Sequence, residues 1–242
     1  MMPKVRSPRH AMANSVRRFV MWPDSLASQD SFRHYGTSRY HGDVLTPIPF
    51  TWPLGAVFLV VLLWSYWPEW RIVRAARRAQ RDREPAQRDP SYRPLLVGQQ
   101  IVIFVAVLVA FMAPHLTIRT AREPLFFAGL VILVAGSLFR RHCFRMLGAD
   151  FRGDVTVRPD QPVVERGAYR YLRHPSYLAA MLLHLGFGLC FTHWGTLGVL
   201  MLAVPPLFVY RIHVEERALR ERLGESYVSY SGRTKRLIPG IW

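Results

Sequence analysis

Cysteine and acidic residues are scarce in this sequence. Its 242 residues include two cysteines, and 16 Asp plus Glu stand against 32 Lys plus Arg. Cys143 and Cys190 offer neither a disulfide framework nor the spacing of metal ligands, so we predict no metal site. A glycine-rich turn between a strand and a helix is also missing, which excludes a nucleotide-binding domain of the Rossmann type.

Formal charge is absent from four long segments, although the chain as a whole is strongly basic. These segments are 44–68, 94–118, 124–139 and 174–210. A helix that crosses a membrane needs about 20 mostly apolar residues, and the first two segments satisfy this directly. The third is short, and flanking residues must complete it. The long side chains of Arg140 and Arg141 could then reach the membrane interface.

The fourth charge-free segment contains 37 residues and is too long for one crossing. As a single helix it would extend about 55 Å, well beyond the hydrocarbon layer. We therefore predict a helical hairpin with its turn at 192–195. Pro205 and Pro206 lie in the second helix, which should start late, bend or break there. The resulting fold class is all-α, a polytopic membrane protein with about five transmembrane helices.

Arginine gathers in two of the connecting segments and predicts their sidedness. The segments 71–93 and 140–173 contain eight Arg each, whereas 113–123 contains two. Positive charge marks cytoplasmic loops, so both segments should face the cytoplasm, and five crossings then place the N-terminus outside. A re-entrant first span would instead leave the N-terminus in the cytoplasm. Basic residues beside apolar spans favour anionic membrane lipids, not nucleic acid, as the partner.

The N-terminal residues 1–49 form a basic extension with no span of their own. They contain no apolar segment followed by a small-residue cleavage site, so we do not expect a cleaved signal peptide. We predict that this extension is poorly ordered. The remaining chain divides into 50–147, which holds the first three spans and the basic loop 71–93, and 148–242.

A polar motif, Arg173-His174-Pro175, begins the predicted hairpin. A residue before proline avoids helical angles, and proline suits the first turn of a helix, so the new helix should start at Pro175. Its free amide groups and partial positive charge, together with the Arg and His side chains, would form a rim that receives anions. The alternative is that these side chains only anchor the helix at the interface.

A second polar cluster follows the last span in the sequence HVEERALRERL. Helical spacing makes Arg211 a neighbour of Glu215, and Glu216 a neighbour of Arg220. Paired carboxylates at a membrane face could bind hydroxyl or amino groups of a ligand, or they could form a solvated helix face. Both clusters bracket one hairpin, so they must lie on the same side of the membrane.

The two motifs resemble those of the isoprenylcysteine carboxyl methyltransferase family and its bacterial homologues. The sequence RGAYRYLRHPSYLAAML is followed downstream by EERALRERLGESY and by the ending RLIPGIW. The resemblance implies that 148–242 is a methyltransferase core with a cytoplasmic pocket for S-adenosylmethionine. It implies catalytic roles for Arg173 and Glu216. The implied cofactor-binding residues are Tyr169, His174, Pro175, Tyr177, Glu215 and Glu216.

The resemblance also implies a function and a location. We expect methyl transfer to a lipophilic acceptor that enters from the bilayer, as in carboxyl O-methylation of an isoprenylcysteine-like substrate. Methylation of a phospholipid amine, a thiol or another apolar metabolite on the same fold is an alternative. A membrane scaffold or transporter component without catalysis is a second one. We expect a bacterial inner membrane with the active site facing the cytoplasm, and the sequence leaves the oligomeric state open.

Overall fold

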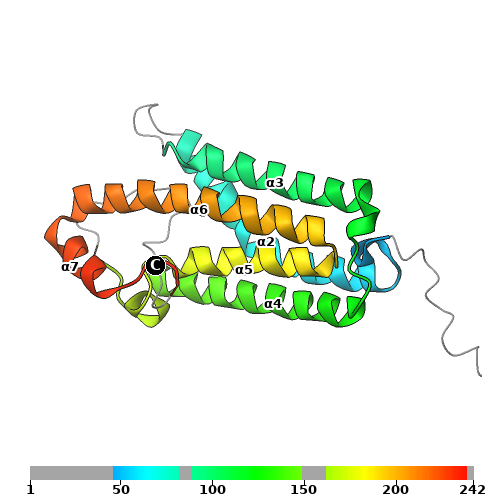
Figure 1. Cartoon of the computed structure of the whole chain (residues 1–242). Helices are drawn as coiled ribbons and strands as arrows, with labels where there is room; N and C mark the ends of the chain where they lie inside the picture. The colour runs from blue at the N-terminus through cyan, green and yellow to red at the C-terminus, as the bar shows by residue number, and fades with distance from the viewer. Residues whose placement is uncertain (1–45, 82–88, 149–161, 239–242) are drawn as a thin grey trace, which may run out of the picture. The chain divides into compact units, whose positions relative to one another are not determined.

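The computed structural model describes residues 46–81, 89–148 and 162–238, all of which lie in the unit Gly42–Trp242 (Figure 1). All regular elements in these ranges are helices, which confirms the all-α class. The long helices are α2 (Leu54–Arg81), α3 (Tyr92–Met112), α4 (Arg122–Leu147), α5 (Pro175–Cys190) and α6 (Trp194–Leu223). The predicted N-terminal extension lies outside the described residues except for 46–49.

Five apolar helices stand at the predicted positions, and four of them are long and apolar enough to cross a membrane. These four are α2, α3, α4 and α6, whereas α5 has 16 residues. At about 1.5 Å per residue α5 extends about 24 Å, less than the hydrocarbon thickness of about 30 Å. The protein is an integral membrane protein whose central helix is shorter than its neighbours.

The helix α6 corrects two of the three outcomes expected at Pro205 and Pro206, the late start and the break. It neither starts late nor breaks, but continues from Trp194 through both prolines to Leu223. Packing against α3 and α5 compensates for the lost backbone hydrogen bonds. With 30 residues α6 is about 45 Å long, so its last turns project beyond a bilayer core and carry the second polar cluster.

The helices α4 and α5 pack side by side along their lengths, as Figure 1 shows. A Cβ atom on Gly129 would lie 2.8 Å from the carbonyl oxygen of Gly186, and one on Gly186 would lie 2.7 Å from the backbone nitrogen of Leu133. Only glycine permits this backbone contact. In addition α5 packs on α6, α6 on α3, and α2 on α4, so the five helices enclose a common interior.

Short elements close the end of the bundle at the predicted turn. The chain reverses between Cys190 and Trp194 as expected, and the backbone N–H of Ile118 donates to the carbonyl oxygen of Thr192 at 2.8 Å. The 3₁₀ helix η3 (Ile48–Phe50) begins the described chain, and Ile48 is buried in the core. The end of the predicted extension is therefore part of the bundle.

Candidate functional site

The Arg173-His174-Pro175 motif joins the 3₁₀ helix η7 (Gly167–Arg170) to the start of α5, as predicted. The extended segment beyond α7 (Glu225–Arg233) pairs with it through the backbone. The N–H of Arg173 donates to the carbonyl oxygen of Lys235 at 2.7 Å, and the N–H of His174 donates to that of Arg236 at 3.0 Å. This C-terminal segment, residues 234–238, is thus fixed beside the motif.

Glu216 connects the two polar clusters through its buried carboxylate. The Nε of Arg173 donates to its Oε1 at 2.8 Å, and Nε2 of His174 lies 3.4 Å from the same oxygen. Arg236 and Arg220 contact Oε2 at 3.1 Å and 3.4 Å. The Arg220 contact is the predicted neighbour on the helix. Four basic side chains thus surround one carboxylate, as charge burial requires.

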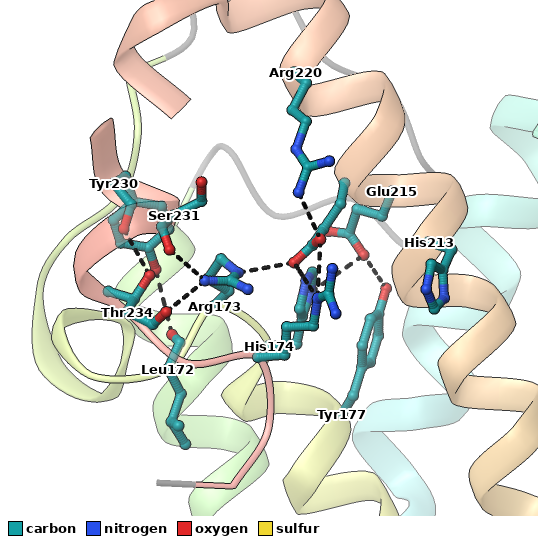
Figure 2. Close-up of polar contacts among 12 residues, drawn as sticks. Leu172, Arg173, His174, Tyr177, His213, Glu215, Arg220, Tyr230, Ser231 and Thr234 are labelled. Atoms are coloured by element: carbon teal, nitrogen blue, oxygen red, sulfur yellow. Dashed lines mark hydrogen bonds and ion pairs between the residues drawn. The ribbon is translucent and has the colours of Figure 1, made fainter. Parts of the chain in front are cut away.

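The side chain of Arg173 also holds the C-terminal segment. Its Nη1 donates to the carbonyl oxygens of Ser231 at 2.7 Å and Thr234 at 2.5 Å. Figure 2 shows these contacts running from Arg173 to the end of α7. A planar guanidinium can make such contacts and the Glu216 contact at once, so Arg173 binds α6, α7 and its own motif together.

Glu215 has different surroundings, because its carboxylate faces the start of α5. The hydroxyl of Tyr177 donates to its Oε2 at 2.5 Å, and Nε of Arg211 donates to the Tyr177 oxygen at 3.2 Å. Arg211, the predicted neighbour of Glu215 on the helix, is connected to this carboxylate through the Tyr177 hydroxyl. It pairs with buried Asp89, which precedes α3, and also donates to Ser91 at 2.6 Å.

Aromatic residues of α7 and the motif add buried hydroxyl groups to the site. Burial raises the pKa of the Tyr230 phenol to about 12, so the hydroxyl stays protonated and donates to the carbonyl oxygen of Tyr169 at 2.7 Å. Burial also raises the pKa of Tyr227, whose hydroxyl has no hydrogen-bond partner among the described residues. The rings of His174 and Tyr177 are stacked with centroids 5.5 Å apart.

A cavity of about 270 Å³ extends from these polar groups into the bundle. Its wall comes from all five long helices, from α7 and from the chain that leads into α5. Polar lining residues include Glu69, Gln99, Arg140, Arg173, His174, Tyr177, His184, Arg211, Glu215 and Tyr227, and apolar ones include Ile72, Leu95, Ile103, Leu183 and Phe208. The cavity therefore has a polar end beside α7 and a largely apolar end inside the spans.

The sequence-predicted site residues gather at the polar end of this cavity, but they do not share one role. Five of them line the wall: Tyr169, Arg173, His174, Tyr177 and Glu215. Pro175 is buried and starts α5, and Glu216 lies behind the wall in its ring of basic groups. Pro175 and Glu216 therefore support the site from outside the cavity.

Several cavity residues were missed by the sequence reasoning. Arg140 binds both carboxylate oxygens of Glu69 and donates to the carbonyl oxygen of Ser176 at 2.5 Å. His184 and Tyr227 also line the cavity. A usable signal existed for Glu69 and Arg140, because ionisable residues within a span point to a functional site. Their pairing across 71 residues carried no signal.

These features define a polytopic membrane protein that joins a buried polar site to an apolar cavity within its spans. Residues 129–221 match the model of the Isoprenylcysteine carboxyl methyltransferase (ICMT) family. This range contains the Arg-His-Pro motif and the Glu215-Glu216 pair. The resemblance noted from the sequence motifs is therefore confirmed.

Named relatives agree with the family match. Protein-S-isoprenylcysteine O-methyltransferase B of Arabidopsis thaliana is 26% identical over 115 residues, which cover 47% of this chain and 58% of the relative. Protein-S-isoprenylcysteine O-methyltransferase of Saccharomyces cerevisiae is 25% identical over 151 residues, covering 60% of this chain and 63% of the relative. The match thus spans less than two thirds of either relative.

A solved structure of a eukaryotic intramembrane Ras methyltransferase, isoprenylcysteine carboxyl methyltransferase, was also found. Its TM-score is 0.48 at 25% sequence identity, and the match covers 63% of this chain and 53% of that one.

Proposed function

We propose that this protein transfers a methyl group from S-adenosylmethionine to the carboxylate of an isoprenylcysteine-like, lipophilic acceptor. The observation that carries the proposal is the single cavity that joins Glu215, His174 and Tyr227 to an apolar wall inside the spans. A polar methyl donor and a lipid-like acceptor can bind next to each other only in a cavity that has both kinds of wall. The family match over 129–221 supports the same chemistry.

The polar end of the cavity fits S-adenosylmethionine. Glu215 offers a carboxylate for hydroxyl or ammonium groups, and the unpartnered hydroxyl of buried Tyr227 calls for a ligand atom. The stacked rings of His174 and Tyr177 can contact a cationic or aromatic group. When bound, S-adenosylmethionine supplies a methyl group on a sulfonium; its transfer to a carboxylate oxygen leaves a neutral thioether and moves no proton.

The carboxylate of the acceptor needs a cation in the cavity wall, which contains Arg140, Arg173 and Arg211. Arg211 already pairs with buried Asp89 and donates to Ser91. Arg173 uses three N–H groups, on Glu216 and on the carbonyl oxygens of Ser231 and Thr234.

Arg140 likewise uses three N–H groups, on Glu69 and Ser176, so Arg140 and Arg173 each keep two of their five for a ligand. Location separates them: Arg140 binds between α2 and α5, whose residues Ile72 and Leu183 add apolar wall, whereas Arg173 contacts the end of α7. We assign the acceptor carboxylate to Arg140, and to Arg173 and Glu216 the positioning of the cofactor end.

The remaining surroundings suit a reaction in the membrane. The wall contributed by α2 and α3 contains Ile72, Leu95 and Ile103, which can contact a hydrocarbon chain. The arginine-rich segments 71–93 and 140–173 favour a cytoplasmic location for the polar end. We propose a bacterial inner membrane, in which the methyl donor comes from the cytoplasm and the acceptor from the bilayer.

The cofactor assignment is tested by titrating S-adenosylmethionine into the detergent-purified protein. Glu215→Gln should weaken binding at least tenfold, because a hydrogen bond to a charged group contributes about 1.5–3 kcal/mol. Glu221→Gln is the matched control, since Glu221 is exposed on the same helix and does not line the cavity. Equal affinity of wild type and Glu215→Gln would remove Glu215 from the cofactor site.

The acceptor is tested with a panel of possible substrates. Wild-type protein and labelled S-adenosylmethionine are incubated with a prenylcysteine carboxylate, a phospholipid amine and an apolar thiol. We expect methyl ester formation on the prenylcysteine, measured as base-labile label. Label on the amine or thiol alone would favour an alternative acceptor, and binding of no cofactor at all would favour a scaffold.

A further inference from the structure

His184 lies deep in the cavity and has one ring nitrogen without a partner. It is on α5, eight residues beyond Ser176, so its Cα lies about 12 Å further along the helix axis. Its ring reaches back toward Ser176 by one turn, as far as Ala180. Its side chain is 3% exposed and lines the cavity. Nδ1 is 2.8 Å from the carbonyl oxygen of Ala180, whereas Nε2 has no hydrogen-bond partner among the described residues.

The Ala180 contact determines what the free nitrogen can do. A carbonyl oxygen only accepts hydrogen bonds, so Nδ1 of a neutral ring carries the proton and donates it. Nε2 is then a lone-pair acceptor on a side chain that lines the cavity. A buried acceptor without a partner costs about 1–3 kcal/mol, and this cost makes binding of a matching N–H or O–H group favourable.

The described residues do not supply that group. Arg140 and Glu69 line the same cavity and interact electrostatically with His184, but the hydrogen bonds of Arg140 go to Glu69 and Ser176. The ring of Phe208 lies 6.3 Å from that of His184, centroid to centroid, and Leu183 completes an apolar surrounding. The partner of Nε2 must therefore come from a ligand in the apolar end.

We propose that His184 is a specificity-determining residue that accepts a hydrogen bond from the amide N–H beside the acceptor's carboxylate. This rests on the proposed function. A carboxylate bound at Arg140 has no hydrogen to offer, whereas an N-acylated amino acid carries an N–H one carbon away from it. Arg140 and His184 together then recognise an acylamino carboxylate. A phospholipid amine offers no such pair of groups.

The test uses two acceptor probes that differ by one hydrogen-bonding group. One is an N-acetyl S-prenylcysteine, and the other is its N-methylated amide, which lacks the amide hydrogen. For the wild type we expect kcat/KM to be about tenfold lower with the N-methylated probe, as the loss of one hydrogen bond requires. For His184→Ala the two probes should have equally low kcat/KM. The dissociation constants of the probes, measured without methyl donor, should likewise differ for the wild type and be equal for His184→Ala.

Two further variants keep the result unambiguous. His184→Gln retains a hydrogen-bond acceptor and should recover part of the preference for the N–H probe. His213→Ala is the matched control, because His213 is exposed on α6 and does not line the cavity. Its preference should equal that of the wild type.

The outcomes separate this assignment from the proposed function. Equal kcat/KM for both probes in the wild type, or an unchanged preference in a folded His184→Ala protein, would overturn the role of His184 alone. Methylation of neither probe by a wild type that binds S-adenosylmethionine would overturn the prenylcysteine function and this assignment with it.

Discussion

Glu215 and Glu216 are neighbours in sequence, yet their carboxylates have different tasks. Glu216 is surrounded by Arg173, His174 and two further basic groups, while Glu215 lines the cavity. The Arg-His-Pro motif and the Glu pair bracket one hairpin, which predicts that both carboxylates lie near the motif. The hairpin does not distinguish the two carboxylates, since a rotation of one residue about the axis of α6 decides which of them faces the interior.

The side chain of Arg173 should be required for docking of the C-terminal segment. Arg173→Lys removes the planar fork, and a single ammonium cannot reach Glu216, Ser231 and Thr234 together. We expect faster amide hydrogen exchange over 234–238 and about tenfold weaker binding of S-adenosylmethionine.

Arg217→Lys is the control for this substitution, because Arg217 is exposed on α6, next to Glu216 in the sequence. It should leave both exchange and binding unchanged. Slow exchange over 234–238 in Arg173→Lys would show that backbone pairing with Lys235 and Arg236 is sufficient to hold the segment.

At the scale of elements, charge-free length and proline position predicted the five helices well. The hairpin turn and the start of α5 at Pro175 both follow from local residue types. The unbroken α6 did not follow, because Pro205 and Pro206 are compensated by packing on α3 and α5. The helix α2 also continues to Arg81 through residues expected in a loop, since Arg and Ala favour helices.

The contact between α4 and α5 should be sensitive to a single methyl group. In Gly186→Ala the new Cβ would lie 2.7 Å from the backbone nitrogen of Leu133 and 2.8 Å from the carbonyl oxygen of Gly129. The helices must then separate, with an expected loss of about 1–3 kcal/mol. Thermal unfolding in detergent should show a lower midpoint than in the wild type.

Gly198→Ala is the matched control for this contact. A Cβ there meets no atom within 4 Å, so the substitution adds a helix-favouring residue to α6 without a clash. Its midpoint should equal or exceed that of the wild type. Equal midpoints for both variants would mean that α4 and α5 do not pack as closely as their backbones indicate.

At the scale of the whole molecule, the site depends on partners that are far apart in the chain. Arg211 meets Asp89 across 122 residues, and Arg140 meets Glu69 across 71. No local pattern encodes such pairs, so sequence motifs located the polar end of the cavity but not its other walls. The motifs located the polar end because the two polar clusters flank one helical hairpin, and the hairpin brings its two ends together.

The same topology predicts which end of the bundle faces the cytoplasm. Thr120 lies in the loop before α4 and Ser226 in α7, at opposite ends of the bundle, and both are exposed. The native Cys143 and Cys190 are buried and should react little. With a membrane-impermeant maleimide on intact cells we expect Thr120→Cys to be labelled, and Ser226→Cys only after permeabilisation, because arginine-rich segments stay in the cytoplasm. The reverse pattern would put the polar end outside, away from cytoplasmic S-adenosylmethionine, and would contradict the proposed route of the methyl donor.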